Sequence, residues 1–344
     1  MLMSANDDDE FFISGRDIYM SNSTNVRLII CVCITSIIML LPAGCGQKQQ
    51  AVDLYVDAVM LREFNENEMA VEKLNSALEL NKRFSLAYSL LGEIYQEIKD
   101  YEKSAASYEK ATELNPWSFK DYFKLGRVYQ IMKKFAQAVK AYAKVCELKP
   151  DHLEAHINAA KSYYEIKDYN NALVYSERAE QIEPNVSEIQ KIIGDIYESK
   201  KEHHQAIASY KRALEIDSNS PEIMTSLAVV YLRISRNEPA KELLTSVTQI
   251  KPDKADAYRH LGYCYLRLED VDKAIESYSR AIEINDKDWQ AYKGLGVAYM
   301  LRAINDENEM LKSKAIYQWR LSLDIKPDQP RHEKLLKLIQ KYLK

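Results

Sequence analysis

The chain has 344 residues, of which only 9 are Gly and 24 are Tyr, with 47% apolar and 28% charged residues. Average usage is about 7% Gly. The composition therefore disfavours sandwiches, barrels and Gly-rich nucleotide-binding folds, and predicts helices joined by turns in which positive φ is rare. The chain has 47 Lys and Arg against 51 Asp and Glu, a net charge of −4. It lacks the basic surplus of duplex-binding domains, so we expect no nucleic-acid partner.

An uncharged, mostly apolar run extends from Leu28 to Leu41. As a helix it spans about 21 Å, less than the roughly 30 Å hydrocarbon core of a bilayer, which favours a signal peptide over a transmembrane helix. The sequence PAGC follows at residues 42–45 and resembles the lipobox of bacterial lipoproteins. This resemblance implies cleavage before Cys45, lipidation of Cys45 in the cell envelope and, because Gly46 follows, a preference for the outer membrane where the organism has one.

Residues 1–44 are thus expected to be a leader that is absent from the mature protein. An acidic segment precedes the apolar run, whereas a signal peptide begins with positive charge, so we expect translation to start at Met20. Residues 45–50 are predicted to be a short tether. The alternatives to a lipidated terminus are an uncleaved anchor and a buried helix.

Removal of the leader leaves Cys146 and Cys264 in different repeats, and we predict two buried thiols without a disulfide.

From residue 51 onward the sequence repeats every 34 residues. Blocks counted from Ala51 carry Tyr at position 11 in seven of eight cases, a small residue at position 8 in all eight, and Ala or Ser at position 20. Large residues at positions 4, 7, 11 and 24 have helical spacing, small residues let two helices cross closely, and Pro at position 32 ends the second helix. Each block is predicted to be a helical hairpin that buries its apolar face only against its neighbours.

These positions resemble the tetratricopeptide-repeat (TPR) family. The third block matches best, with Tyr122, Leu125, Gly126, Tyr129, Ala138, Tyr142 and Pro150. The resemblance implies an all-α fold, a right-handed superhelical solenoid of eight helix-turn-helix repeats over residues 51–327. It also implies a concave groove, lined by the first helix of each repeat, that binds partner proteins or extended peptides.

The C-terminal part departs from the repeat in two places. Between Tyr299 and Ala315 the eighth repeat contains seven additional residues. They either lengthen each helix by one turn or form a flexible loop. Residues 328–344 carry Leu335 and Ile339 on one helical face, which predicts a capping helix over the last repeat, with a membrane-surface helix as the alternative.

Signatures of catalysis or metal binding are scarce. His152 and His156 are four residues apart, but the Glu between them is misplaced for the HExxH zinc pattern, so we interpret both as solvated surface residues. His203 and His204 fall in a turn. We therefore predict no enzymatic activity, no metal or other cofactor, and no small-molecule substrate.

The resemblance places groove-facing side chains at positions 2, 5, 6, 9, 12 and 13 of each repeat. The candidate partner-binding residues at these positions are Lys120, Phe123, Lys124, Arg127, Tyr164, Arg233, Arg259, His260, Tyr263 and Arg267. Basic residues interleaved with aromatic ones suit an extended peptide that bears carboxylates. An ordinary solvated helix face is the alternative.

The sequence thus predicts a lipid-anchored adaptor of the bacterial cell envelope that docks partner proteins through its repeats. A substrate-recruiting subunit of a separate envelope enzyme, such as a glycosyltransferase, and a cytoplasmic scaffold are the alternatives.

Overall fold

The structure of the protein is a computed structural model, and it describes residues 45–342. Within this range the chain forms seventeen α-helices and no strand. It divides into two compact units, the first ending at Ile94 and the second beginning at Tyr95. The predicted signal peptide over residues 1–44 and the predicted start at Met20 lie outside the described residues.

The first unit contains α2 (Cys45–Glu63), α3 (Asn67–Leu80) and most of α4 (Ser85–Glu97). Helices α2 and α3 pack as a hairpin. Because α2 begins at Cys45, residues 45–50 are its first turns, and the separate tether expected from the sequence is absent. The Gln and Lys side chains of this segment have good helix propensity, and continuing the helix satisfies backbone groups that a tether would leave to water.

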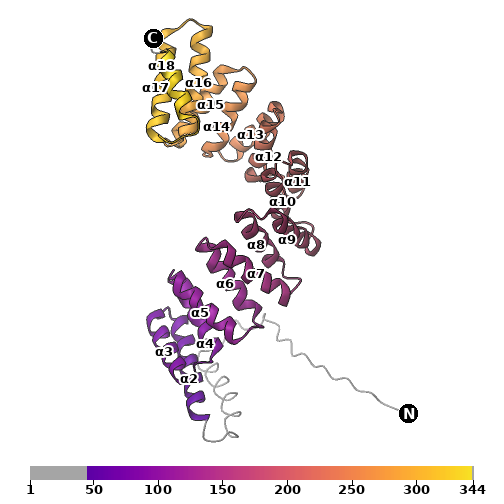
Figure 1. Ribbon diagram of the computed structural model, residues 1–344, viewed down its shortest axis with the longest axis vertical. Coiled ribbons are helices and arrows are strands. Elements are labelled where there is room, and N and C mark those ends of the chain that lie inside the picture. Colours follow the sequence, from indigo (N-terminus) through magenta and orange to yellow (C-terminus); the bar gives the residue numbers. More distant parts are fainter. Residues whose placement is uncertain (1–44, 343–344) are drawn as a thin grey trace, which may run out of the picture. The chain divides into compact units, whose positions relative to one another are not determined.

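The second unit is a stack of antiparallel hairpins, visible as consecutive helix pairs in Figure 1. Its helices are α5 (Tyr101–Leu114), α6 (Phe119–Ile131), α7 (Phe135–Leu148), α8 (Leu153–Glu165), α9 (Tyr169–Ile182), α10 (Ser187–Ser199), α11 (His203–Ile216), α12 (Pro221–Arg233), α13 (Asn237–Ile250), α14 (Ala255–Arg267), α15 (Val271–Ile284), α16 (Trp289–Asn305), α17 (Glu309–Ile325) and α18 (His332–Tyr342). We call the first helix of each complete hairpin, α6, α8, α10, α12, α14 and α16, an A helix, and the second a B helix. Their starts confirm the predicted 34-residue frame and the all-α fold.

The core lies between the A and B helices of each hairpin. In the third repeat the ring of Tyr142 on α7 is fully buried beside Tyr129 and Val128 of α6. Gly126 of α6 lies directly beneath this ring, and a Cβ atom added there would come within 2.7 Å of the Tyr142 Cε1. The small residue predicted at position 8 therefore makes room for an aromatic side chain at position 24.

Every turn between the two helices of a repeat contains a residue with positive φ, and none of these residues is Gly. In the third repeat this residue is Lys133, with φ of 56°. The next N–H, that of Lys134, donates to the Tyr129 carbonyl over 2.8 Å and closes a Schellman motif. The expectation that positive φ would be rare is wrong, because these hydrogen bonds compensate for the strain of a side chain in the left-handed region.

The insertion in the eighth repeat lengthens both helices. Helices α16 and α17 have 17 residues each, whereas the A and B helices of the seventh repeat have 13 and 14. This confirms the predicted extra turn and rejects the flexible loop. Helix α18 packs on α17 and buries Leu335 and Ile339 against Trp319. Its apolar face is therefore used as the cap that the sequence predicts, and is not left free for a membrane surface.

Candidate functional site

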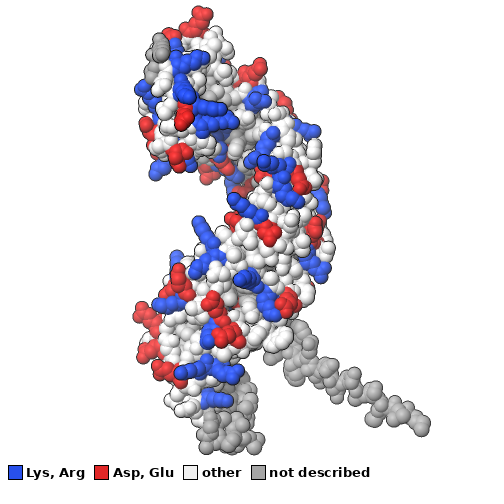
Figure 2. Space-filling view, viewed as in Figure 1, with Lys and Arg blue, Asp and Glu red and all other residues white. Residues whose placement is uncertain are grey.

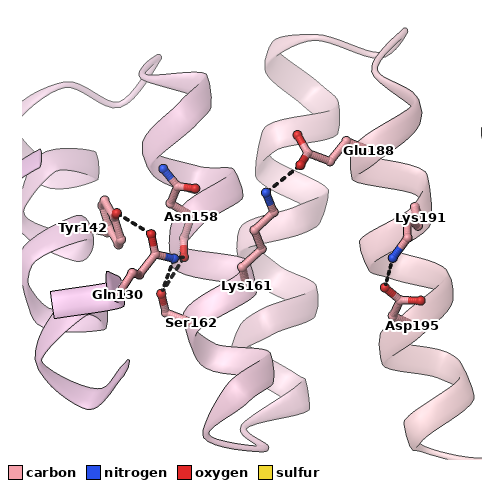
Figure 3. Close-up of polar contacts among 8 residues, drawn as sticks. All are labelled: Gln130, Tyr142, Asn158, Lys161, Ser162, Glu188, Lys191 and Asp195. Atoms are coloured by element: carbon pink, nitrogen blue, oxygen red, sulfur yellow. Dashed lines mark hydrogen bonds and ion pairs between the residues drawn. The ribbon is translucent and has the colours of Figure 1, made fainter. Parts of the chain in front are cut away.

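Polar side chains link neighbouring repeats along the exposed face of the A helices. Lys161 reaches from α8 to Glu188 on α10, with 2.5 Å between Nζ and Oε1 (Figure 3). Between α6 and α8 the contact is neutral, because the Gln130 amide donates to Ser162 Oγ over 2.9 Å and accepts from the Tyr142 hydroxyl. These contacts hold the groove positions of successive repeats in register.

The same face is hollowed over α10, α12 and α14. The hollow has a volume of about 420 Å³, and we call it the central groove segment. Its lining residues are Lys191, Asp195, Glu198, Tyr210, Glu222, Thr225, Ser226, Val229, Arg233, Lys254, Asp256 and His260. Ten of these twelve, all but Tyr210 and Lys254, stand at positions 2, 5, 6, 9, 12 or 13 of their repeats, which are the positions that the family resemblance predicts to face a groove.

Most of the charged side chains in the central groove segment are paired. Arg233 Nε lies 2.7 Å from Glu198 Oε1, and Lys191 Nζ lies 2.6 Å from Asp195 Oδ2. Asp195 also accepts a hydrogen bond from the Tyr210 hydroxyl. Burial raises the pKa of this hydroxyl, and the negative charge of Asp195 raises it further. Such partly exposed pairs contribute about 0–1 kcal/mol each, so an incoming charged segment can exchange with them at little cost.

His260 adds a neutral group to this segment. It is half-buried on α14, and burial together with the neighbouring Arg259 guanidinium lowers its pKa to about 4. At neutral pH the ring is therefore uncharged and offers one hydrogen-bond donor and one acceptor. His260 is therefore not one of the basic groups that the sequence predicts at the groove positions.

The remaining candidates on α14 lie outside the central groove segment. Arg259 is half-buried and pairs with Asp288, with 2.8 Å between Nε and Oδ2. Asp288 also caps α16 by accepting the N–H groups of Gln290 and Ala291. Tyr263 and Arg267 are both exposed. Arg259 therefore contributes to the junction between repeats, whereas Tyr263 and Arg267 are accessible to a partner.

Two predicted aromatic contacts are engaged within the protein. Phe123 on α6 lies 4.9 Å from the His152 ring and 5.7 Å from the Tyr142 ring, between centroids, and belongs to the core of the third repeat. The Tyr164 hydroxyl lies 3.0 Å from Ser199 Oγ on the next A helix. Both side chains hold repeats together.

The basic candidates on α6 are further along the same face. Lys120 and Arg127 are exposed, and Lys124 is half-buried. The structure does not gather them into the central groove segment, which begins at α10.

His152 and His156 are not the solvated residues expected from the sequence. His152 Nδ1 accepts the Ala155 N–H over 3.2 Å and caps α8. His156 is buried, and its Nε2 donates to the Pro150 carbonyl over 3.0 Å. Burial lowers the pKa of His156. The physical reason is its place at position 4 of the repeat, where the large inward-facing side chain belongs.

Within residues 45–342, the cysteines of the repeats are not activated as nucleophiles. The two cysteines in the repeats form no disulfide, and burial raises the pKa of both Cys146 and Cys264 to about 12, which keeps them as weakly nucleophilic thiols. Over the same range no three His, Cys, Asp or Glu side chains are close enough to hold a metal ion. Among the described helices, none combines the length and the apolar character that crossing a bilayer requires.

Comparison with known families finds tetratricopeptide repeats in five segments. The description "Tetratricopeptide repeat" matches residues 86–116, 122–152, 153–186 and 255–288, and "TPR repeat" matches residues 194–235. No curated protein matches the sequence.

Solved structures share the fold at low identity. The Cut9-Hcn1 hetero-tetramer of the APC/C is 18% identical, with 92% of this chain and 60% of that chain covered and a TM-score of 0.56. The C-terminal part of a TPR repeat-containing protein from Cytophaga hutchinsonii is 18% identical, with 70% and 99% covered and a TM-score of 0.56. A tetratricopeptide repeat protein from Parabacteroides merdae is 15% identical, with 73% and 99% covered and a TM-score of 0.53.

Proposed function

Because the chain belongs to the tetratricopeptide-repeat family, we propose that it is a non-enzymatic scaffold for protein–protein interaction. The central groove segment on α10, α12 and α14 receives a segment of the partner. The observation that carries this proposal is the hollow of about 420 Å³ to which three successive A helices each contribute polar side chains.

The pattern of charges indicates the character of the bound segment. Cations and carboxylates alternate across the central groove segment, as the pairs of Lys191 with Asp195 and of Arg233 with Glu198 show. Over the face in view, Figure 2 likewise shows both signs interspersed. A partner segment with charges of both signs can replace these pairs one for one, and Thr225, Ser226 and neutral His260 can hydrogen-bond to its backbone.

A matched pair of substitutions tests the groove. Arg233→Glu reverses a charge inside the central groove segment, where Arg233 pairs with Glu198. Arg212→Glu makes the same change on the B helix α11, where Arg212 pairs with Glu180 over 2.8 Å outside the groove. We expect Arg233→Glu to weaken capture of the natural partner by about tenfold and Arg212→Glu to leave it unchanged, with helicity intact in both.

Site-specific cross-linking locates the contact independently. A photoreactive residue at Val229 lies in the central groove segment, whereas the same residue at the exposed Val174 on α9 lies outside it. Cross-links to the same partner from Val174 but not from Val229 would move the binding face to the B helices.

We further propose that the protein is anchored to a bacterial envelope membrane by lipid on Cys45, in the outer membrane where there is one. The apolar run from Leu28 to Leu41 and the lipobox-like PAGC support this. Helix α2 begins at Cys45, so the first repeat would follow the lipid without a linker. Cys45→Ser should release the protein from membranes and abolish incorporation of labelled fatty acid. Unchanged membrane retention of the variant would refute the anchor.

A further inference from the structure

The eighth repeat exposes an apolar stripe that its neighbours do not have. Val297, Leu301 and Ile304 on α16 are 37%, 41% and 56% exposed, and Met310 at the start of α17 is 70% exposed. The spacing of four and then three residues places the first three on one side of the helix, over a length of about 10 Å. We call these four residues the tip surface.

The insertion extends this stripe beyond the regular repeat. Helix α16 has 17 residues, whereas α14 has 13 and α18 has 11. Ile304 lies in the additional turn, beyond the level at which α14 ends, and Met310 follows on the other side of the turn. Both side chains are consequently left more than half exposed.

Each of the other A helices of the second unit carries at least one polar residue at the two equivalent positions. Positions 9 and 13 are Lys161 and Glu165 in the fourth repeat and Asp195 and Ser199 in the fifth. Among the six A helices, only α16 has apolar residues at both positions, Val297 and Leu301. The apolar surface on α16 consequently runs lengthwise along the helix. Across successive repeats it continues only at position 9, through Val229 on α12 and Tyr263 on α14.

This shape favours a helical occupant over an extended one. An extended segment that crosses the A helices at position 9 would meet Val297 but would leave Leu301 and Ile304 uncovered. A helix lying along α16 would cover all three with one face. Two turns of an amphipathic helix present apolar side chains at i, i+4 and i+7, which matches the stripe.

A positive charge beside the apolar stripe indicates that the bound helix carries an acidic residue next to its apolar face. Arg267 on α14 occupies position 13, level with Leu301 on α16, and the two helices are in contact. Adjacent A helices are joined at this level elsewhere, where Glu198 pairs with Arg233. Arg267 is exposed and makes no ion pair with any residue of the described range, in contrast to Arg233 and Arg259.

We propose that the tip surface docks an amphipathic helix of a partner protein, whose apolar face packs along α16 and whose flanking carboxylate pairs with Arg267. The inference rests on the proposed scaffold function and adds a second contact, of different chemistry, to the central groove segment. A partner that engages both would be held by a polar segment and a helical one, which increases its effective concentration at each site.

The test uses the full chain and a displayed library of random peptides of about 16 residues, long enough for four helical turns. The library is selected on the wild type and counter-selected on the variant Leu301→Asp/Ile304→Asp. We expect the enriched peptides to carry apolar residues at i, i+4 and i+7 and an acidic residue beside them. Enrichment of no peptide, or of peptides without this pattern, would overturn the proposal.

Fluorescence anisotropy with the enriched peptide then assigns the contacts. The double variant should weaken binding by about tenfold or more. Arg267→Glu should weaken it severalfold and restore affinity for a peptide in which Lys replaces the acidic residue. Tyr317→Asp, an equally drastic change at an exposed residue of α17 outside the tip surface, is the matched control and should have no effect. Equal binding to a scrambled peptide would also overturn the proposal.

Two further results separate the possible occupants and the two sites. Concentration-dependent dimerisation that Leu301→Asp/Ile304→Asp abolishes would show that a second copy of the chain covers the tip surface, and would overturn the proposal. Loss of partner capture by Arg233→Glu together with failure of the peptide selection would overturn only the tip surface. The reverse result would overturn only the central groove segment.

Discussion

The third and fourth repeats solve the same packing problem in opposite ways. In the third, Gly126 on α6 leaves room for the buried ring of Tyr142 on α7. In the fourth, the equivalent residues are Ala160 and Ser176, both buried. Its aromatic side chain is shifted by one position to Tyr175, which stacks on Tyr163 with 5.2 Å between ring centroids.

This exchange holds throughout the array. Position 24 is aromatic in five repeats, and position 8 is Gly in each: Gly92 with Tyr108, Gly126 with Tyr142, Gly194 with Tyr210, Gly262 with Tyr278 and Gly296 with Trp319. Position 24 is not aromatic in three repeats, and position 8 is Ala in each: Ala58 with Leu74, Ala160 with Ser176 and Ala228 with Leu244. A Cβ atom and an aromatic ring compete for one volume, so the two positions form a steric pair.

The largest effect is expected from removing the ring of the third repeat. Tyr142→Ala leaves a cavity above Gly126 and takes away the donor to Gln130, and should destabilise the chain by about 3–5 kcal/mol. Ser176→Ala at the equivalent position of the fourth repeat removes only a hydroxyl that bonds its own helix and should change stability by less than about 1 kcal/mol. Urea unfolding of the full chain followed by circular dichroism measures both, and equal losses would disprove the distinction.

Adding one methyl group tests the steric pair directly. Gly126→Ala brings a Cβ to 2.7 Å from the Tyr142 ring. This overlap should cost about 1–3 kcal/mol, whereas the higher helix propensity of Ala contributes about 1 kcal/mol, so we expect a net destabilisation. In the Tyr142→Leu background, which copies the Ala and Leu pair of the sixth repeat, the same change should stabilise by about 1 kcal/mol. A double-mutant cycle in urea without this reversal of sign would contradict the pairing.

Acid should affect the fourth repeat through its buried histidine. Burial lowers the pKa of His156 below its ordinary value of 6.5, so the unfolded chain takes up the proton first. The contribution of His156 to stability is therefore complete above pH 6.5 and falls as the pH decreases below it. The urea midpoint of His156→Gln should decrease less between pH 7.5 and pH 5 than that of the wild type. Identical decreases would mean that His156 is not the titrating group.

The smallest change in stability is expected from the turns between the two helices, which have the same backbone conformation in the third and fourth repeats. Lys133 and Lys167 occupy the same turn position with φ of 56° and 62°. Replacing either by Gly relieves left-handed strain but adds freedom to the unfolded chain, for a net stabilisation of about 0.5–1 kcal/mol. Similar increases in the free energy of unfolding for Lys133→Gly and Lys167→Gly would show that the two repeats differ only in their cores. A decrease for either variant would show that the lysine is not strained at its positive φ.

Much of the fold could be predicted because the period of 34 residues encodes it. Tyr at position 11 and small residues at positions 8 and 20 identify the helical hairpin, and the phase of Ala315 after the insertion favours an extra turn in each helix, which the structure contains. The burial of His156 was also readable, since it stands at an inward position of the repeat. The spacing between His152 and His156 does not show this burial, whereas the position of His156 in the repeat does.

The candidate site was predictable only as a set of positions. Lys161, Arg233 and Arg259 stand where groove residues belong, but each is paired with a carboxylate that lies on a neighbouring A helix or caps it. His260 is uncharged because it is buried beside Arg259. Whether a basic side chain is free to bind a partner depends on carboxylates about thirty positions away in the sequence. The pattern within one repeat does not reveal these pairs.

By itself the sequence determined the hairpin, its period, the additional turn and the cap, because each follows from spacing within one or two helices. Only the tertiary structure decided which charges are neutralised, where the A helices are hollowed, and which apolar side chains of the eighth repeat remain uncovered. Those properties arise between repeats, where the length of one helix and the side chains of the next fix what solvent or a partner can reach.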